Sequence, residues 1–297
     1  MKLSCVSLAI SAVITLSSQS AALPPCEPVE PTLMLLDGGV ITPVTVEEYV
    51  AGVVAHELPY TFEPEAMKAQ AVAARTYLYY CLAHDSHPHE SADVCTDITH
   101  CMGYITEAGL AERYGADSAA RSMEAAIAAA HATEGEVILY NGEPILAVWH
   151  SSSGGKTEDC AAVWEQSLPY LVSVDTPETA ETFSLSFSLD EISRRLSTAG
   201  YKYNRSLIVS STATDSGRCA SLTIGSVTLD GGEARSVFGL RSTDFKAFSF
   251  GGRLYFFVSG YGHGAGMSQY GANAMAESGA GYREILAHYY TGAAVYP

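Results

Sequence analysis

The segment 45–77 constrains the fold most, because it predicts two helices that are joined by a short turn. Thr45, with Glu48 three residues later, has the capping-box pattern that begins a helix. Pro59 ends this helix, and Pro64 suits the first turn of the next one, where its missing N–H group costs nothing. The apolar residues of the first helix recur at helical spacing and predict a buried face: Val46, Tyr49, Val50, Val53 and Val54.

The next position on this apolar face is a carboxylate, Glu57. A carboxylate that loses water among apolar residues is expected to have a raised pKa, as a general acid at neutral pH requires. The alternative is a structural ion pair between Glu57 and Lys68 or Arg75, which lie on one face of the second, alanine-rich helix. Because buried ion pairs also perturb pKa values, the spacing alone leaves both interpretations open.

Composition bounds the ligand class. The chain has 297 residues, of which 47% are hydrophobic, which is enough for one large or two modest domains. Its net charge is −17 and only 16 residues are Lys or Arg, with no basic cluster. Nucleic acid is therefore not an expected partner, since phosphate contacts need Lys and Arg. Uncharged sugars suit such a protein better, and its 18 tyrosines can supply flat contact surfaces.

The N-terminus predicts export. Residues 1–22 read as a signal peptide, with an apolar stretch at 3–16 and small residues before a cleavage site after Ala21 or Ala22. A retained membrane anchor is the alternative, although the apolar stretch is short and interrupted by serine. A proline-rich linker, 23–36, then leads into a first strand. We expect a protein that is secreted or anchored on the outer side of the membrane.

The remaining chain mixes helical and strand patterns, which predicts an α+β fold in one domain at 37–297. A helical lobe at about 45–133 carries Glu57, a β-rich lobe with antiparallel hairpins follows at about 135–260, and helices at 268–290 complete the chain.

Within the β-rich lobe, the Asn-Gly pair at 141–142 predicts a hairpin whose second strand ends at His150. A short helix is expected at 186–199. Strands are expected from 207 to 237, with a turn at 230–232.

Two glycine-rich segments carry polar side chains just after predicted strands, HSSSGG at 150–155 and GYGHGAG at 260–266. Loops of this kind on a rigid scaffold often line binding sites, so we expect them to hydrogen-bond a sugar. A Ser–His hydrolase is disfavoured because the G-x-S-x-G elbow is missing, and simple turn formation is the other alternative. The substrate-binding candidates here are His150, Ser151, Ser152, Ser153, Tyr261, His263 and Gln269.

A metal site is possible at Cys95, His100 and Cys101, because thiolate and imidazole ligands suit zinc. The spacing is not a standard zinc motif, and a disulfide between Cys95 and Cys101 is an equal alternative in an exported protein. A tetrahedral zinc needs a fourth ligand, for which water or a neighbouring histidine is available: His84, His87 or His89.

Several long blocks resemble the stage II sporulation protein D family (SpoIID/LytB): EYVAGVVAHELP, EAMKAQAVAARTY, HSSSGGKTEDCAAVW, LPYLVSV, GYGHGAGMSQYGANAMAESG and YREILAHYYTG. They lie in the family's order and cover most of residues 37–297. The resemblance implies a lytic transglycosylase that cleaves the glycan strands of peptidoglycan, with Glu57 as its catalytic acid. His56 and Leu58, which flank Glu57, are variants within this motif.

The resemblance also fills in roles and partners. It implies that Cys95, His100 and Cys101 hold a structural zinc, and it favours a supporting role for Arg75, in the AARTY step. Lys68 and Arg75 lie on a helix face expected to point toward Glu57, so both are candidates to bind the carboxylate or lactyl groups of the substrate; offsetting buried charge is the alternative. It implies a function in engulfment during sporulation, with a cell-wall amidase as the partner that strips stem peptides. No organic cofactor is expected.

A single acid is chemically sufficient for a lytic transglycosylase. Glycoside cleavage usually needs two carboxylates, and no second Asp or Glu has a sequence position that indicates a catalytic role as clearly as that of Glu57. A lytic transglycosylase instead uses the sugar's own C6 hydroxyl as the nucleophile.

Two other functions stay open. The first is a glycan-binding activator, or enhancer, of a cell-wall amidase, which requires no acid. The second is a zinc hydrolase of stem peptides that uses Cys95, His100 and Cys101. A catalytic zinc site with two thiolates and two adjacent ligands is less typical.

Overall fold

The computed structural model describes residues 32–86, 89–164, 166–179 and 181–297, and residues 31–297 form one compact unit. The predicted signal or anchor at 1–22 lies outside the described residues. Strand β1 (Thr32–Asp37) begins inside the range predicted as a linker. Among the described residues, no helix combines the length and the apolar character that crossing a bilayer requires.

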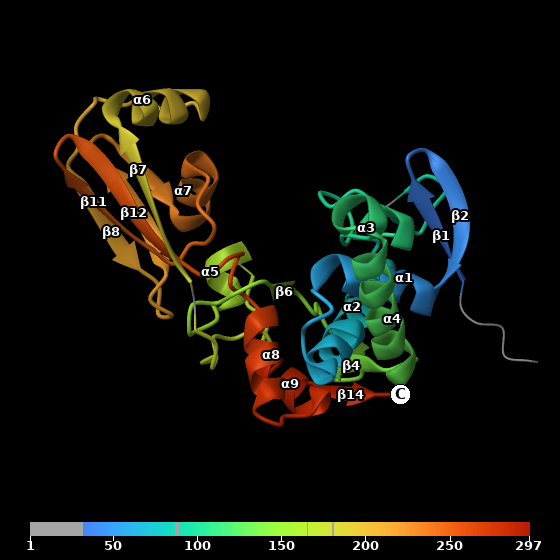
Figure 1. The fold of residues 1–297 in the computed structure, drawn as a ribbon. Coiled ribbons are helices and arrows are strands. Elements are labelled where there is room, and N and C mark those ends of the chain that lie inside the picture. The colour runs from blue at the N-terminus through green and yellow to red at the C-terminus, as the bar shows by residue number, and fades with distance from the viewer. Residues whose placement is uncertain (1–31, 87–88, 165, 180) are drawn as a thin grey trace, which may run out of the picture. The chain divides into compact units, whose positions relative to one another are not determined.

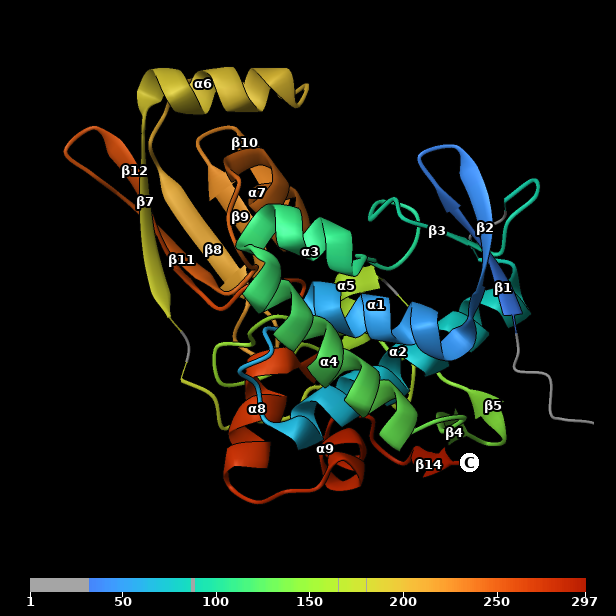
Figure 2. The same cartoon turned by 45° about the vertical axis from the view of Figure 1, so that its right-hand side comes forward.

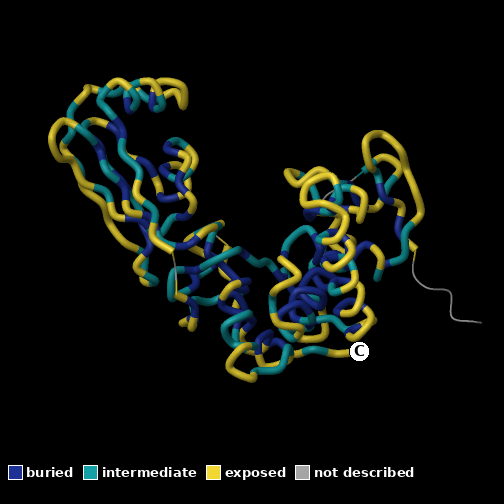
Figure 3. The backbone as a smooth tube through the Cα atoms, in the orientation of Figure 1, coloured by how far each residue is buried: buried dark blue, intermediate teal, exposed yellow. Residues whose placement is uncertain are grey.

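The predicted helix pair is α1 (Val46–Glu57) and α2 (Pro64–His84) (Figure 1). The capping box is confirmed, because the Thr45 hydroxyl accepts from the Glu48 N–H at 3.2 Å and the Glu48 carboxylate accepts from the Thr45 N–H at 2.8 Å. Both helices are buried along most of their length, as the dark tube in Figure 3 shows. Helix α4 (Ala116–Ala132) packs against both, and α3 (Glu107–Tyr114) packs on α4 (Figure 2).

A small sheet stands beside this helical part. Strands β1 and β2 (Val40–Thr45) form an antiparallel hairpin, and β2 leads directly into α1. The short strand β3 (Val94–Cys95) pairs parallel to β1, with Cys95 opposite Leu36. The pairing fixes the place of Cys95 in the long segment between α2 and α3.

The predicted hairpin at the Asn-Gly pair is confirmed. Strands β4 (Val137–Tyr140) and β5 (Glu143–Pro144) are antiparallel, and Asn141 and Gly142 both have positive φ, +54° and +86°, as a two-residue hairpin turn requires. The C-terminal strand β14 (Ala294–Tyr296) pairs with the other edge of β4.

The prediction that the second hairpin strand runs to His150 is wrong. Strand β5 ends at Pro144, and His150 belongs to a separate short strand, β6 (Trp149–His150). Strand β6 pairs parallel to β13 (Met267–Ser268), which comes from the far end of the chain. This pairing sets Trp149 beside the start of α8 (Gln269–Glu277), which α9 (Tyr282–Tyr289) follows.

The β-rich part contains two three-stranded antiparallel sheets, ordered β11-β12-β7 and β10-β9-β8. Their shared apolar core includes Phe256 of β12 and also takes side chains from two helices, Ile192 from α6 and Phe238 from α7. The short helix α5 precedes this part. The elements are α5 (Cys160–Trp164), β7 (Thr182–Ser188), α6 (Leu189–Thr198), β8 (Val209–Ala213), β9 (Cys219–Ile224), β10 (Val227–Asp230), α7 (Gly231–Phe238), β11 (Phe245–Phe250) and β12 (Arg253–Ser259).

The α+β class is confirmed, with two local corrections in this part. The helix predicted at 186–199 is α6, which begins at Leu189, because residues 186–188 belong to strand β7. The turn predicted at 230–232 is the start of helix α7. The Asp230 carboxylate caps the helix by accepting from the Glu233 N–H at 2.7 Å, and the Glu233 side chain accepts from the Asp230 N–H at 2.9 Å. The glycine pair suggested a turn, but the capping box formed by Asp230 and Glu233 favours a helix more strongly.

Candidate functional site

Glu57 is the last residue of α1, and two side chains from distant segments converge on it. The Trp149 indole N–H and the Gln269 amide each donate a hydrogen bond of 3.0 Å to Oε2 of Glu57. Trp149 comes from β6 and Gln269 begins α8, and the β6–β13 pairing brings these two segments together. The tertiary structure therefore fixes one oxygen of the carboxylate.

The pKa of Glu57 contradicts the sequence-based prediction. Burial favours the neutral acid, but the adjacent His56 ring and the hydrogen bonds from Trp149 and Gln269 outweigh it, so the pKa lies below its ordinary value of 4.5. The prediction of a raised pKa is wrong because the apolar stripe of α1 is visible in the sequence and the distant donors are not.

Glu57 remains accessible. Its side chain is 23% exposed and opens onto a cavity of about 380 Å³ that α3 and α4 help to enclose. Among the residues that the structure describes, Oε1 has His56 Nδ1 as its one polar neighbour, at 3.5 Å, which is at the limit of a hydrogen bond. Polar and aromatic side chains line the cavity, among them His56, Tyr60, Arg113, Tyr114, Ser118 and Ser122.

The two cations of α2 do not reach Glu57. Arg75 is fully buried, forms an ion pair with Glu47, and donates to the backbone oxygens of Ala130 and Glu136 at 3.1 Å each. Its predicted role in substrate binding is therefore corrected to a structural one. Lys68 forms an ion pair of 2.6 Å with Glu65 on the helix surface, so the proposed ion pair with Glu57 is also absent.

The residue of α2 that does reach this site is Gln70, which the sequence analysis missed. Its side-chain oxygen accepts from the Gln269 amide at 3.4 Å, and the residue is fully buried. A lone glutamine in an alanine-rich buried helix was the available signal. Trp149 was also missed, although it is one of only two tryptophans and directly precedes the HSSSGG segment.

His150 and Ser153 form a buried scaffold behind Trp149. His150 Nε2 lies 2.6 Å from the Ser153 hydroxyl, and its Nδ1 lies 3.1 Å from the Ala265 carbonyl oxygen. Burial, followed by the charges of His263 and Arg218, lowers the pKa of His150 well below 6.5. Both residues are at most 4% exposed, so they do not form an accessible Ser–His nucleophile and they hold the loop in place. Their predicted direct contact with substrate is corrected accordingly.

The other predicted residues line two further cavities. His263, whose pKa burial lowers to about 4, lines a cavity of about 630 Å³ together with Glu158 and Arg235. Ser151, Ser152 and Tyr261 line a cavity of about 350 Å³. Gln269 is the one predicted binding residue whose side chain contacts Glu57 directly.

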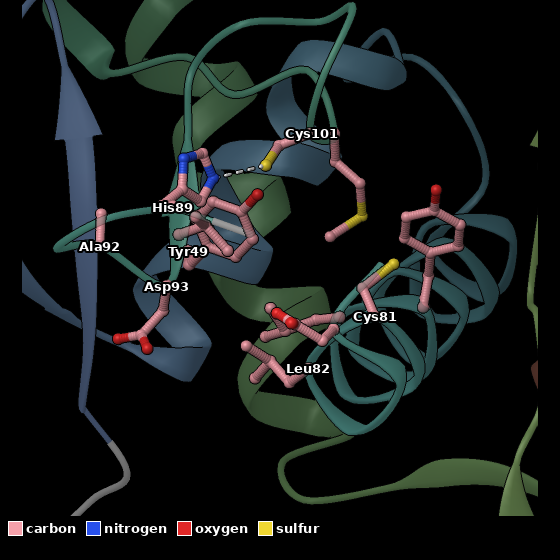
Figure 4. Close-up of a pocket in the computed structure, with 12 residues that line it drawn as sticks. Tyr49, Cys81, Leu82, His89, Ala92, Asp93 and Cys101 are labelled. Atoms are coloured by element: carbon pink, nitrogen blue, oxygen red, sulfur yellow. Dashed lines mark hydrogen bonds between the residues drawn. The ribbon is translucent and has the colours of Figure 1, made fainter. Parts of the chain in front are cut away.

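The predicted metal ligands lie together. The side-chain donor atoms of Cys95, His100 and Cys101 cluster with that of His89, all within 4.8 Å of one another. His89 Nε2 is 3.4 Å from the Cys101 sulfur, which Figure 4 shows, and His100 Nδ1 is 3.7 Å from the Cys95 sulfur. Cys95 and Cys101 are free thiols, so the alternative disulfide is not formed. Two sulfurs and two imidazoles fit a tetrahedral structural zinc site.

His89 is the histidine that can supply the fourth ligand. His84 instead contacts the Tyr80 carbonyl oxygen at 2.8 Å, and His87 lies outside the described residues.

Comparison with known proteins places this arrangement in a family. The family model of stage II sporulation protein matches residues 37–140. The stage II sporulation protein D of Bacillus amyloliquefaciens is 36% identical over 257 residues, covering 84% of this chain and 73% of that protein. The chain belongs to the stage II sporulation protein D family.

Two further relatives show the range of this likeness. The stage II sporulation protein D of Bacillus subtilis is 36% identical over 256 residues, covering 84% of this chain and 74% of that protein. The amidase enhancer of Bacillus subtilis is 29% identical over 307 residues, covering 81% of this chain but 39% of that protein. In this family member, Glu57, Trp149 and Gln269 come from three separate segments; Glu57 and Gln269 lie inside blocks that carried the resemblance, and Trp149 directly precedes another.

Proposed function

We propose that this protein is a lytic transglycosylase that acts outside the cytoplasm on peptidoglycan glycan strands, in sporulation, with Glu57 as its acid. The arrangement of the Glu57 carboxylate carries this proposal. Trp149 and Gln269 anchor Oε2, whereas the neighbour of Oε1 among the described residues is His56 Nδ1, at 3.5 Å, and the side chain opens onto a cavity. One oxygen thus fixes the orientation and the other is available to carry a proton to a substrate.

A single carboxyl group can complete the reaction. Protonated Glu57 gives its proton to the bridging glycosidic oxygen as the bond from that oxygen to C1 of the muramic acid breaks. The C6 hydroxyl of the same sugar attacks C1 and returns its proton to Glu57, which leaves a 1,6-anhydro ring and the original acid. No water is consumed. Sugar that fills the cavity displaces water from the carboxylate and favours its protonated form.

A second function has one observation in its favour. The donors around Glu57 lower its pKa, so the group is ionised at neutral pH in the unliganded protein. A permanently ionised carboxylate can bind sugar hydroxyls without catalysis. With the likeness to an amidase enhancer, this favours a glycan-binding activator of a cell-wall amidase as the alternative.

Replacement of Glu57 by Gln separates the two functions, because it removes the acid and keeps the shape. With peptide-free glycan strands, the wild-type protein is expected to release products ending in 1,6-anhydro-muramic acid. Glu57→Gln is expected to reduce that release by at least about 100-fold. The exposed Glu124 on α4 supplies a matched control, and Glu124→Gln is expected to keep wild-type activity.

Mass spectrometry of the products decides between the mechanisms. Reducing ends in place of anhydro ends contradict the transglycosylase and indicate a hydrolase. No product from the wild type, with the strands still bound, supports the amidase activator.

We also propose that a zinc ion is held by His89, Cys95, His100 and Cys101 and has a structural role. It would link β3 to the segment that follows α2, and its chemistry there is the neutralisation and tetrahedral binding of two thiolates.

The cell-wall amidase expected from the sequence remains part of the proposed transglycosylase function, as the partner that supplies peptide-free strands.

A further inference from the structure

An arginine that has no charged partner among the described residues lines the cavity of about 350 Å³. Among the described residues, the guanidinium of exposed Arg241 makes no hydrogen bond and no ion pair. It lies over the ring of Phe183, 3.5 Å from the ring centroid, and 5.9 Å from the centroid of Tyr261. The aromatic rings hold the guanidinium in position and leave its N–H groups free for a ligand.

The two segments that hold Glu57 also contribute to the wall of this cavity. Ser151 lies two residues after Trp149, Tyr270 directly follows Gln269, and both line the cavity. The Tyr270 N–H donates to the Ser151 carbonyl oxygen at 3.0 Å, which ties the two segments together. A chain of sugars bound at Glu57 therefore has this cavity as its neighbour.

The chemistry of the cavity suits one part of a glycan strand. Tyr261 and Tyr270 offer rings, and Ser151 and Ser152 offer hydroxyl groups, which are the contacts that sugars use. A guanidinium binds a carboxylate through two parallel hydrogen bonds. On a peptide-free strand the only carboxylate is the D-lactyl group of each muramic acid, and an attached stem peptide converts it to a neutral amide.

We propose that Arg241 binds the lactyl carboxylate of muramic acid and thereby selects strands whose stem peptides have been removed. This proposal rests on the proposed function, since it deepens the substrate class of the same site. The other cations considered for this role are occupied, Lys68 by Glu65 and Arg75 by Glu47. Glu181 also lines the cavity, but it forms no ion pair with Arg241 and leaves the guanidinium available.

Binding is measured in the Glu57→Gln protein, so that turnover does not interfere. The probes are peptide-free glycan strands and the same strands with their lactyl carboxyl groups converted to primary amides. The Glu57→Gln protein is expected to bind the free-carboxylate strands about tenfold more tightly than the amidated strands. Adding Arg241→Gln is expected to abolish that preference and to leave the affinity for amidated strands unchanged.

Two other basic residues provide controls. Lys246→Gln removes the same charge from an exposed position on β11 outside the cavity and is expected to keep the preference. Arg235→Gln changes the cavity of about 630 Å³ and is also expected to keep it.

Three results overturn the proposal: no preference in the Glu57→Gln protein, a preference that survives Arg241→Gln, or an equal loss in either control. Failure of the proposed function appears separately, as the absence of 1,6-anhydro products from the wild type while the binding preference persists.

Discussion

At the scale of single residues, the site depends on which groups donate to Glu57. Two hydrogen bonds to Oε2 and the nearby His56 outweigh the effect of burial and lower the pKa of the carboxyl group. A general acid must be protonated, so we expect kcat/KM to fall as the pH rises above this pKa. The donors that orient Glu57 therefore also restrict the pH range in which it can act as an acid.

Trp149→Phe tests this dependence. The change removes a donor that favours the ionised form, so the pKa of Glu57 rises and the pH at which kcat/KM begins to fall moves upward. The measurement is the pH dependence of 1,6-anhydro product release. Trp164→Phe, at the protein's other tryptophan, is the matched control and is expected to leave the profile in place. A profile that stays fixed or moves downward in Trp149→Phe contradicts the role given to the indole.

At the scale of elements, a buried ion pair joins the helices around the site. Arg75 of α2 pairs with Glu47 of α1 and donates to the backbone at the end of α4, so one side chain connects all three helices. Its position explains why a residue in a family-like motif need not contact substrate.

Arg75→Ala is expected to destabilise the protein by about 3–5 kcal/mol, because it leaves the Glu47 carboxylate buried without its partner. Lys68→Ala breaks a pair that is partly exposed to solvent and is expected to cost less than about 1 kcal/mol. Urea denaturation followed by circular dichroism measures both. Similar losses for the two variants are the result that contradicts the structural assignment of Arg75.

The proposed zinc site, formed by four side chains, also concerns how elements are held together. A zinc ion that binds only the folded protein stabilises it, so removal by a chelator is expected to lower Tm. Elemental analysis is expected to find about one zinc per chain, and Cys95→Ser is expected to reduce both the metal content and Tm. A wild-type protein without zinc, or one whose Tm does not respond to the chelator, contradicts the proposed site.

At the scale of the whole molecule, the charge of −17 opposes a polyanionic ligand. A peptide-free glycan strand carries a carboxylate on each muramic acid, so long-range repulsion slows its approach to the protein. The local attraction of Arg241 for the carboxylate is then opposed by the repulsion from the protein's net negative charge. The preference for free-carboxylate strands is expected to be most evident when salt screens that repulsion.

Salt should therefore accelerate association. Between about 0.01 M and 0.1 M salt the Debye length falls from about 30 Å to about 10 Å, which screens the repulsion. The association rate of free-carboxylate strands is expected to rise severalfold, whereas amidated strands serve as the uncharged control and show little change. Surface plasmon resonance measures both rates. A rate that falls with salt for the free-carboxylate strands contradicts this account.

The sequence alone determined the local features of this protein. The capping box at Thr45, the buried face of α1 and the Asn-Gly hairpin follow from interactions between residues close together in the chain, so their patterns suffice to predict them. The same holds for the placement of Glu57 at the end of an apolar helix face. Cys95, His100 and Cys101 lie within seven residues of one another, so their proximity was also predictable.

The tertiary structure decided what surrounds Glu57. Trp149 and Gln269 are 92 and 212 residues away in the chain, and only the parallel pairing of β6 with β13 brings them to its carboxylate. These donors reverse the direction of the predicted pKa shift. The packing of α1, α2 and α4 also buries Arg75, whereas Arg241, between α7 and β11, stays exposed and forms no ion pair with the residues that the structure describes. Contacts between distant segments depend on how the elements pack, and no local pattern encodes them.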